Sequence, residues 1–460
     1  MKTYRLLPLL LLALALPAQA QDAERGDLLI TNATVLTVTN GTLENTDILV
    51  RDGRIAQLGQ GLSAPRGATT IDATGRYVMP GIIDAHSHIA ISNVNESTNP
   101  VTAEVSVGDV LDPFDVGLYR ALAGGVTTSH VMHGSANVIG GQCETIKHRY
   151  GVLDPALLEM EGAPRTIKFA LGENPTRVHG RGRNIQPSTR MGVEFVLREA
   201  FSQAQRYQEA WDRYEAERRT NDRAVPPAYH ERLEVLADIL AGEILVQSHS
   251  YRADEILMLM RVLEDFGVDR VTFQHANEGF KVAPELAAFG TDGAGASVFA
   301  DWWAYKFEVY YSTAYNAAIL TRNGVTASIN SDSGELNRHL YHEAAKTQKY
   351  GDLTDDEALA LITINPAKQL GIDARVGSIE VGKDADLAIF SAHPLSIYAI
   401  PQQTIVDGIV RFDIEADPDD VRLMTDPEEQ VEAVTLWQGH DHDRCLEGTY
   451  DLVDFMTIYR

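Results

Sequence analysis

The feature that most constrains this chain is a set of five polar residues, each placed where an apolar run ends. They are His86, His88, His249, His275 and Asp332. Because residues i and i+2 of a strand point to the same face, His86 and His88 can hold one ion together. A parallel β/α barrel would bring the other three residues to the same place, since all its strand ends meet at one face.

The order of elements along the chain predicts such a barrel with a flanking β-domain. Residues 21–80 hold short β-rich runs between turn signals, and residues 371–412 return to this character. Residues 81–370 alternate apolar runs with helical stretches, which suits an α/β fold of the (β/α)8 TIM-barrel type, about 250 residues plus insertions. We expect the two flanks to assemble into one small composite β-sandwich.

Two helices within the barrel span have recognisable limits. Residues 189–222 are rich in Glu, Arg, Gln and Ala and predict one long, mostly exposed helix. The sequence Thr354-Asp-Asp-Glu357 is a capping box and predicts the start of another helix. We expect that helix to end at Asn365-Pro366, because the residue before a proline disfavours the helical region.

The two ends of the chain differ from the rest. Residues 1–20 combine a basic start, an apolar stretch and Ala18-Gln-Ala20, a pattern typical of a signal peptide cut after Ala20. The alternative is an uncleaved membrane anchor, although the apolar stretch is short for a span of about 20 residues. We therefore expect a periplasmic or secreted protein that is free of the membrane after cleavage. Residues 413–460 form an acidic C-terminal extension.

The charge and the cysteines exclude several classes of partner and framework. A formal net charge of −26 argues against nucleic acid and against an anionic membrane surface. Cys143 and Cys445 are the only cysteines, so no disulfide framework exists, and they either pair with each other or stay free. His440 and His442 mimic a metal cluster but lie outside the barrel pattern. A homo-oligomer remains compatible with the sequence.

One further ligand is expected between the first and the fifth barrel strand, where two candidates compete. Glu173 stands at the expected strand end, level with the other ligands, and is the preferred ligand. Lys168 lies five residues deeper, roughly 16 Å away at the rise of a strand. Lys168, in carboxylated form, is the alternative bridging ligand, and it could share the site only if the strand ended early.

These residue types predict a hydrolytic metal centre. Imidazole and carboxylate ligands suit one or two divalent ions, zinc first, with manganese, iron or nickel as alternatives. Such an ion lowers the pKa of its bound water to about 7. Asp332 could then accept the proton of that water and pass it to a leaving amine. Weaker candidates for binding a small-molecule substrate are His133, Asn137, Arg177 and Arg190.

The chain resembles the amidohydrolase superfamily and, more narrowly, the imidazolonepropionase-related metal-dependent hydrolases of bacteria. The likeness covers about residues 28–412. The matching segments are Val78–His88, Ala123–Thr128, Gly134–Gly141, Lys168–Pro175, Thr363–Lys368 and Gly377–Asp386. The resemblance implies a metal-bearing TIM barrel, a composite β-sandwich and hydrolysis of amide or cyclic-amide C–N bonds.

Two departures and several alternatives accompany the resemblance. Gln247 stands where relatives often carry a second histidine, and the residues after Asp332 lack the His or Pro that often follows. The superfamily includes deaminases and dipeptidases, and some members without ligands serve as assembly proteins, so the fold does not name the substrate. Retention of the five candidate residues favours an enzyme over a non-catalytic barrel. A two-lobed solute-binding protein does not fit the flanking β-domain.

Overall fold

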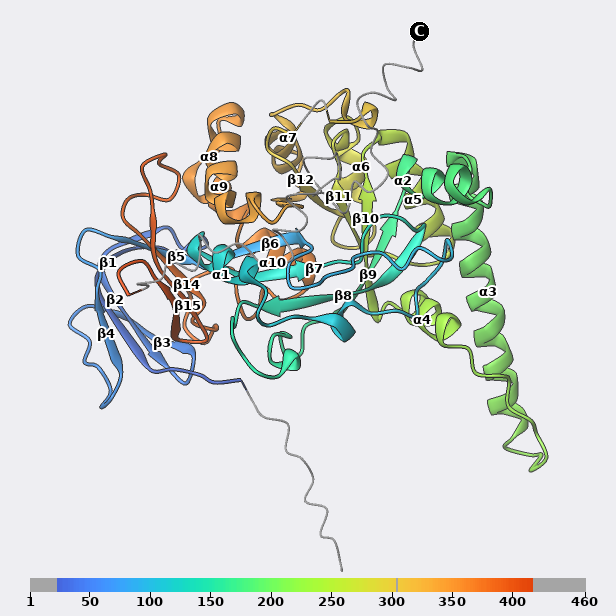
Figure 1. Cartoon of the computed structure of the whole chain (residues 1–460), viewed down its shortest axis with the longest axis horizontal. Coiled ribbons are helices and arrows are strands. Elements are labelled where there is room, and N and C mark those ends of the chain that lie inside the picture. The colour runs from blue at the N-terminus through green and yellow to red at the C-terminus, as the bar shows by residue number, and fades with distance from the viewer. Residues whose placement is uncertain (1–22, 303–304, 417–460) are drawn as a thin grey trace, which may run out of the picture.

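The computed structural model describes residues 23–302 and 305–416, which form a barrel joined to a β-domain (Figure 1). The predicted signal peptide and the residues His440, His442 and Cys445 lie outside these ranges. Cys143 is buried and unpaired within them. No helix in the described part of the chain has both the length and the apolar character needed to cross a membrane.

Eight strands form the barrel sheet and hydrogen-bond in the order of the sequence. They are β6 (Ile82–Ser87), β7 (Val126–Val131), β8 (Ile139–Lys147), β9 (Arg165–Ala170), β10 (Ile244–Ser250), β11 (Val271–His275), β12 (Gly295–Val298) and β13 (Thr326–Ile329). The sheet nearly closes just beyond β13. There the Asp332 N–H donates to the His86 carbonyl at 3.0 Å. The prediction of a TIM-type barrel is confirmed.

One strand departs from the parallel arrangement that the sequence suggested. Strand β8 runs antiparallel to both β7 and β9, whereas β9 to β13 form parallel ladders. A parallel neighbour needs a crossover of about a dozen residues or more. The connection from Val131 to Ile139 is shorter than that. Part of the glycine-rich stretch 134–141 therefore enters β8, and only its first half forms a loop.

Helices pack around the outside of the barrel (Figure 1). They are α1 (Val116–Ala123), α2 (Glu173–Pro175), α3 (Arg190–Glu217), α4 (Glu231–Leu240), α5 (Ala253–Asp265), α6 (Ala283–Ala288), α7 (Asn316–Arg322), α8 (Leu340–Gly351), α9 (Asp355–Ala360) and α10 (Ile364–Leu370). One large apolar cluster fills the space between strands and helices. Within it Phe169 of β9 and Phe201 of α3 lie with ring centroids 6.1 Å apart. Burying one such side chain contributes roughly 1.5–3 kcal/mol.

The two helix predictions had different outcomes. The long helix exists as α3, and its buried residues all lie between Val193 and Tyr207, so its last turns project beyond the barrel. The capping box at Thr354 is present at the start of α9. The predicted end at Asn365-Pro366 is wrong, because α9 already ends at Ala360. Pro366 instead lies in the first turn of α10, where its missing N–H leaves no helical hydrogen bond unmade.

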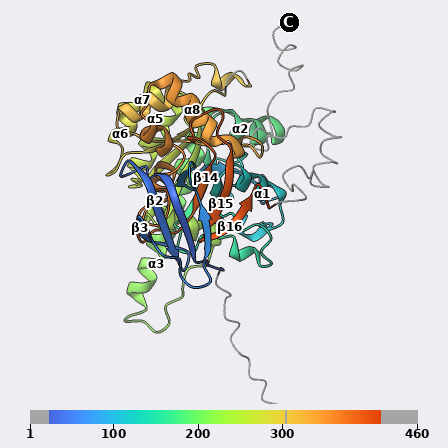
Figure 2. The same ribbon diagram turned by 90° about the vertical axis from the view of Figure 1, so that its left-hand side faces the viewer.

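The β-domain draws its strands from both flanks of the barrel (Figure 2). The strands are β1 (Leu28–Leu36), β2 (Thr42–Arg51), β3 (Arg54–Gly59), β4 (Thr69–Asp72), β5 (Tyr77–Pro80), β14 (Leu387–Phe390), β15 (Pro401–Val406) and β16 (Ile409–Asp413). An antiparallel ladder between β5 and β14 joins the two flanks. Hydrogen bonding is continuous through one eight-stranded sheet. Two irregularities in β1 let its first half pair with β4 and its second half with β5.

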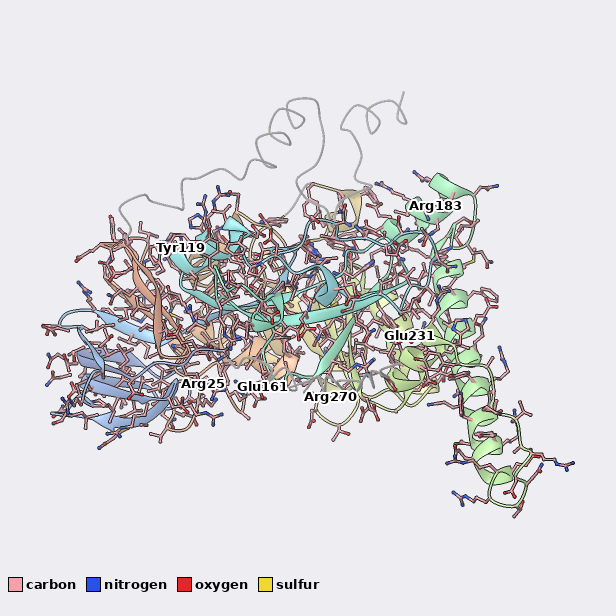
Figure 3. The ribbon with its side chains drawn as sticks, turned by 60° about the horizontal axis from the view of Figure 1, so that its bottom comes forward. Arg25, Tyr119, Glu161, Arg183, Glu231 and Arg270 are labelled. Atoms are coloured by element: carbon pink, nitrogen blue, oxygen red, sulfur yellow. The ribbon has the colours of Figure 1, made fainter. Side chains whose placement is uncertain are left out.

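A buried group of charges fastens the β-domain to the barrel. Lys147, the last residue of β8, is fully buried, and its Nζ lies 2.8, 3.1 and 2.6 Å from carboxylate oxygens of Asp384, Asp386 and Asp407. Arg149 Nε adds a contact of 2.7 Å to Asp407. On the underside of the molecule Arg25 and Glu161 also bridge the two parts at 3.9 Å (Figure 3). Exposed pairs of this last kind contribute little stability.

Candidate metal centre

The five predicted residues all lie at one end of the barrel, where their strands finish. His86 is the penultimate residue of β6, His249 is the penultimate residue of β10, and His275 ends β11. His275 and Asp332 have left-handed backbones, with φ of 67° and 47°. Such conformations cost on the order of 1 kcal/mol in a residue other than glycine and gather at functional sites. They turn both side chains into the centre as the chain leaves the sheet.

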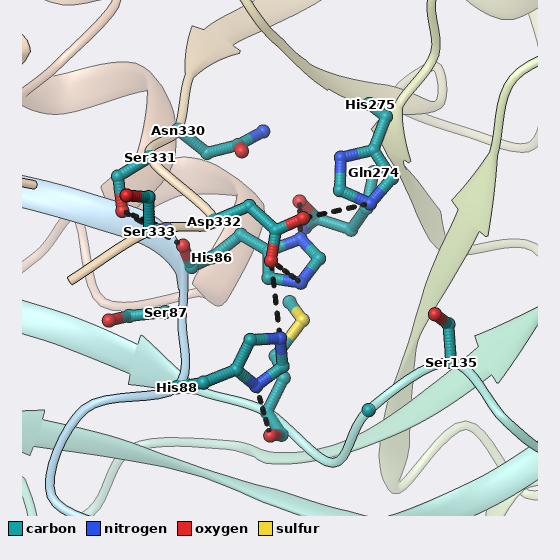
Figure 4. A network of polar contacts seen from close by, with 12 residues as sticks. His86, Ser87, His88, Ser135, Gln274, His275, Asn330, Ser331, Asp332 and Ser333 are labelled. Atoms are coloured by element: carbon teal, nitrogen blue, oxygen red, sulfur yellow. Dashed lines mark hydrogen bonds and ion pairs between the residues drawn. The ribbon is translucent and has the colours of Figure 1, made fainter. Parts of the chain in front are cut away.

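The side chains converge on one buried point (Figure 4). Asp332 Oδ1 lies 3.2 Å from His88 Nε2 and 3.4 Å from His86 Nε2, and Asp332 Oδ2 lies 3.7 Å from His275 Nε2. One ligand atom from each of His86, His275 and Asp332 fits within 4.8 Å of the others. The ring of His249 is 4.6 Å from that of His275. The structure thus brings all five candidates together.

The structure changes the balance between Glu173 and Lys168, because its geometry favours Lys168. Strand β9 ends at Ala170, so Lys168 lies near the strand end rather than deep in the barrel. Its Nζ is fully buried, 2.9 Å from His86 Nε2 and 3.4 Å from the Met132 sulfur. Glu173 instead begins α2, where its carboxylate lies 3.5 Å from Arg177.

Burial sets the protonation of the ligands. It lowers the pKa of His275 to about 3 and the pKa values of His86 and His249 well below their usual range. Burial opposes ionisation of Asp332 as well, but the neighbouring His88 and the positive charges around it hold its pKa below the usual value. Neutral imidazoles and an ionised carboxylate are the forms that bind a metal.

The unmet hydrogen-bonding capacity of two rings fits a metal ion. Both ring nitrogens of His249 and both of His275 are buried without a hydrogen-bond partner among the described residues. Leaving such a buried polar atom unsatisfied costs about 1–3 kcal/mol. His88 Nδ1 lies 2.8 Å from the Met132 carbonyl. A carbonyl only accepts, so Nδ1 carries the proton and Nε2 offers its lone pair to the centre. The residues present therefore fit a divalent cation.

Comparison with known proteins identifies the family. An amidohydrolase from Thermotoga maritima MSB8 matches with a TM-score of 0.77 and 33% sequence identity, over 84% of this chain and 100% of that one. The chain belongs to the amidohydrolase family. The model of the amidohydrolase family also matches residues 276–415.

Other relatives of this amidohydrolase are larger or more distant. Amidohydrolase tasK of Hapsidospora irregularis is 34% identical over 395 residues, which are 80% of this chain and 40% of tasK. The chain thus spans 40% of the length of that relative. An adenosine deaminase from Xanthomonas campestris with bound zinc has a TM-score of 0.52 at 18% identity, covering 90% of this chain and 98% of its own. That likeness shows the fold alone.

Two candidate substrate contacts instead hold the loop before β8. His133 Nε2 accepts the Glu96 N–H at 2.8 Å, and burial lowers its pKa to about 4. The Asn137 amide donates to the carbonyls of Glu96 and Asn99 and to the Thr102 hydroxyl, at 2.8, 2.7 and 2.8 Å. Both side chains are buried. In this geometry they stabilise the loop rather than face a substrate.

The two candidate arginines are engaged with carboxylates. Arg177 lies 3.5 Å from Glu173, and Arg190 lies 3.0 Å from Glu255 and also pairs with Glu308. A substrate carboxylate would have to compete with these partners.

An aromatic wall beside the metal ligands was not predicted. Tyr251 stacks on His275 with ring centroids 5.1 Å apart, and Phe299 stacks on the same imidazole at 4.9 Å. Lys306 Nζ lies 3.8 Å from the Tyr251 ring centroid. Tyr251 is two residues after His249, so the alternation of a strand could have indicated it. Nothing in the local sequence marks Lys306, which reaches the wall from the loop after β12.

Asp84 is a further residue that the sequence analysis missed, and it positions Asp332. It precedes His86 by two residues in β6 and is fully buried. Its carboxylate accepts the Ser331 N–H at 3.0 Å and the Ser331 hydroxyl at 2.5 Å. Burial raises its pKa to about 7. By fastening Ser331 to β6, Asp84 fixes the neighbouring Asp332 above the barrel end.

Proposed function

We propose that this protein is an exported, metal-dependent hydrolase that cleaves the C–N bond of an amide or cyclic amide in a small molecule. The observation that carries the proposal is the buried convergence of the candidate ligands, with unsatisfied ring nitrogens on His249 and His275. Membership of the amidohydrolase family supports the reaction class, because the Thermotoga relative of that name matches along its whole length.

The nitrogens of the four histidines and the oxygens of Asp332 would hold one or two divalent ions. Zinc suits these donors best, with manganese, iron or nickel as alternatives. When bound, such an ion supplies Lewis acidity, which polarises a carbonyl and lowers the pKa of water to about 7. Asp332 would accept the proton of the attacking water and deliver it to the leaving nitrogen.

Lys168 would complete the ligand set as a carbamate. Its amine is buried beside His86, and no carboxylate of the described residues lies within ion-pair distance of it. The neutral amine would attack CO2, forming an N–C bond, while one proton leaves the nitrogen for solvent. The product is an anionic carbamate whose oxygens suit a divalent ion. Mass spectrometry under native conditions should show one added CO2 in the wild type and none in Lys168→Met.

A substrate screen tests the proposed reaction. Protein from residue 21 onward is loaded with zinc or manganese and offered N-acyl amino acids, dipeptides, lactams and imidazolones, with release of amine or ring opening as the readout. We expect turnover of at least one class, lost on chelation. Asp332→Asn should reduce turnover by roughly 10²–10⁴-fold, as expected for loss of a general acid–base, while keeping most of the metal. A metal-loaded protein that turns over none of these classes would favour a binding barrel or a deaminase instead.

Export is tested separately from catalysis. The basic, apolar and Ala18-Gln-Ala20 segments motivate it. Fractionation of expressing cells should place the chain in the periplasm with Gln21 as its first residue. A full-length chain in the cytoplasm would overturn the export proposal and leave the reaction class untouched.

A further inference from the structure

Two glutamines lie inside the barrel directly below the metal centre. Gln247 of β10 and Gln274 of β11 are both fully buried. In the parallel ladder His249 is level with Gln274, and Gln247 is level with Lys168 on the other side. Side chains in register share a face, so these residues all point to the barrel interior. Gln274 therefore belongs to the layer of the ligand His249.

Gln274 contacts a metal ligand directly. Its Oε1 lies 3.2 Å from His86 Nδ1, while its Nε2 donates to Gln247 Oε1 at 2.9 Å and to the Ala85 carbonyl at 3.5 Å. The Ala85 carbonyl can only accept, which fixes the amide with its nitrogen toward Ala85 and its oxygen toward His86. An amide oxygen also only accepts, so His86 must carry its proton on Nδ1.

This orientation leaves His86 Nε2 with a lone pair on the side of the other ligands. Lys168 Nζ lies 2.9 Å from that nitrogen and Asp332 Oδ1 lies 3.4 Å from it. His88 obtains the same orientation from a backbone carbonyl, that of Met132. His86 obtains it from a side chain, which a substitution can remove.

We infer that Gln274, held in place by Gln247, is a positioning residue that sets the tautomer and ring orientation of His86 for metal binding. The inference rests on the proposed metal centre. It also explains the glutamine at position 247, where relatives often have histidine. Gln247 is no substitute ligand, because its oxygen accepts from Gln274. Its Nε2 has no partner among the described residues.

The test measures zinc affinity by competition with a chromophoric chelator. Gln274→Met keeps the size of the side chain but removes the acceptor for His86. Loss of a partner of this kind typically weakens metal binding about 10–100-fold, and we expect that loss here. Gln274→Glu keeps the acceptor, and the free Nε2 of Gln247 can turn to donate to it. This variant should therefore lose much less zinc affinity than Gln274→Met, below the roughly 10-fold that removal of such a partner typically costs.

Gln369→Met is the matched control. Gln369 is also buried and also makes two hydrogen bonds, to the Ser328 hydroxyl at 2.7 Å and the Thr326 carbonyl at 2.8 Å, but it lies on α10 away from the ligands. Its zinc affinity should equal that of the wild type. A second readout is the visible absorption of the cobalt-loaded protein, which should change in Gln274→Met and stay unchanged in the control.

Two results would overturn the inference while leaving the metal centre intact. One is wild-type zinc affinity and an unchanged cobalt spectrum in Gln274→Met. The other is an equal loss in Gln369→Met, which would indicate general loosening of the barrel. If Gln274→Met does not fold, Gln247→Met replaces it, and unchanged zinc affinity there would also contradict the inference. A wild-type chain that binds no zinc would instead overturn the metal centre itself.

Discussion

Two fully buried lysines of this barrel have opposite surroundings. Lys147 lies among three aspartates at the junction with the β-domain, with its Nζ 2.6–3.1 Å from their oxygens. Burial opposes its charge, but these aspartates raise its pKa above the usual value. Lys168 lies beside an imidazole nitrogen and a thioether, and no described carboxylate is within ion-pair distance.

The comparison distinguishes Lys147, which stabilises the fold, from Lys168, which we assign to the metal centre. A buried charge is tolerated where partners compensate it and is costly where they do not. Lys147 is compensated and joins two parts of the chain. No described carboxylate contacts Lys168, which has only the longer-range charge of Asp332, so a reaction at its amine would explain its position. The contrast leads to predictions with opposite signs for the same substitution.

The largest effect is expected for Lys147→Met. The change leaves Asp384, Asp386 and Asp407 buried with only arginines at their edge. Removing one charged partner from a buried ion cluster costs about 3–5 kcal/mol. The free energy of unfolding, measured in urea, should therefore fall by that amount. A loss below 1 kcal/mol would show that the cluster does not hold the two parts together.

Lys168→Met should have the opposite effect on stability. In the metal-free protein it removes a buried amine that no described carboxylate contacts, and the free energy of unfolding should stay the same or rise, by up to about 1–3 kcal/mol. Chelator-treated samples of wild type and variant are compared in the same urea titration. Destabilisation as large as that of Lys147→Met would remove the distinction between the two lysines.

A partly buried acid of β8, the strand that also carries Lys147, extends the comparison to pH. Burial, and then the neighbouring Glu159, raise the pKa of Glu144 to about 7. The folded state therefore holds a proton that the unfolded state releases near its ordinary value, and this contribution to stability declines as pH rises toward 7. Glu144→Gln should remove the decline and gain about 1–3 kcal/mol at pH 8. Parallel pH–stability curves in both proteins would contradict this.

The smallest effect is expected for Glu173→Gln. Glu173 begins α2 and pairs with Arg177 at 3.5 Å. The zinc affinity of Glu173→Gln should differ from that of the wild type by less than about 10-fold, the smallest loss that is typical when a residue supporting a metal ligand is replaced. A larger loss than in Lys168→Met would restore the preference that the sequence alone suggested.

The sequence was sufficient to predict the candidate ligands at the ends of regular strands. It could not predict where an individual strand stops or which residue adopts an unusual backbone conformation. The period-two pattern indicated that His86, His88 and His249 meet at one end of the barrel, as the structure shows. It could not show that β9 stops at Ala170, which brings Lys168 to the centre. Nor could it show the left-handed backbone at His275, because the conformation of a single residue at a strand end leaves no periodic signal.

The fold, too, was predictable where it depends on periodic patterns and unpredictable where it depends on local backbone geometry. The barrel and the β-domain from two flanks were predictable, since both rest on long patterns of apolar residues. The reversal of β8 was not, because it depends on a short connection between Val131 and Ile139 rather than on periodicity. For the arginine and loop candidates, composition could not show that these polar side chains already have partners in the fold.

The central claim is tested most directly by the zinc content of folded Lys168→Met protein, determined by elemental analysis beside the wild type. The account predicts one or two zinc ions per wild-type chain, as its donor set suits, and a clear deficit in Lys168→Met with unchanged circular dichroism. The folded fraction of the Lys147→Met protein should contain as much zinc per chain as the wild type. Full zinc occupancy and normal turnover in Lys168→Met would contradict the claim that this buried amine is part of the metal centre.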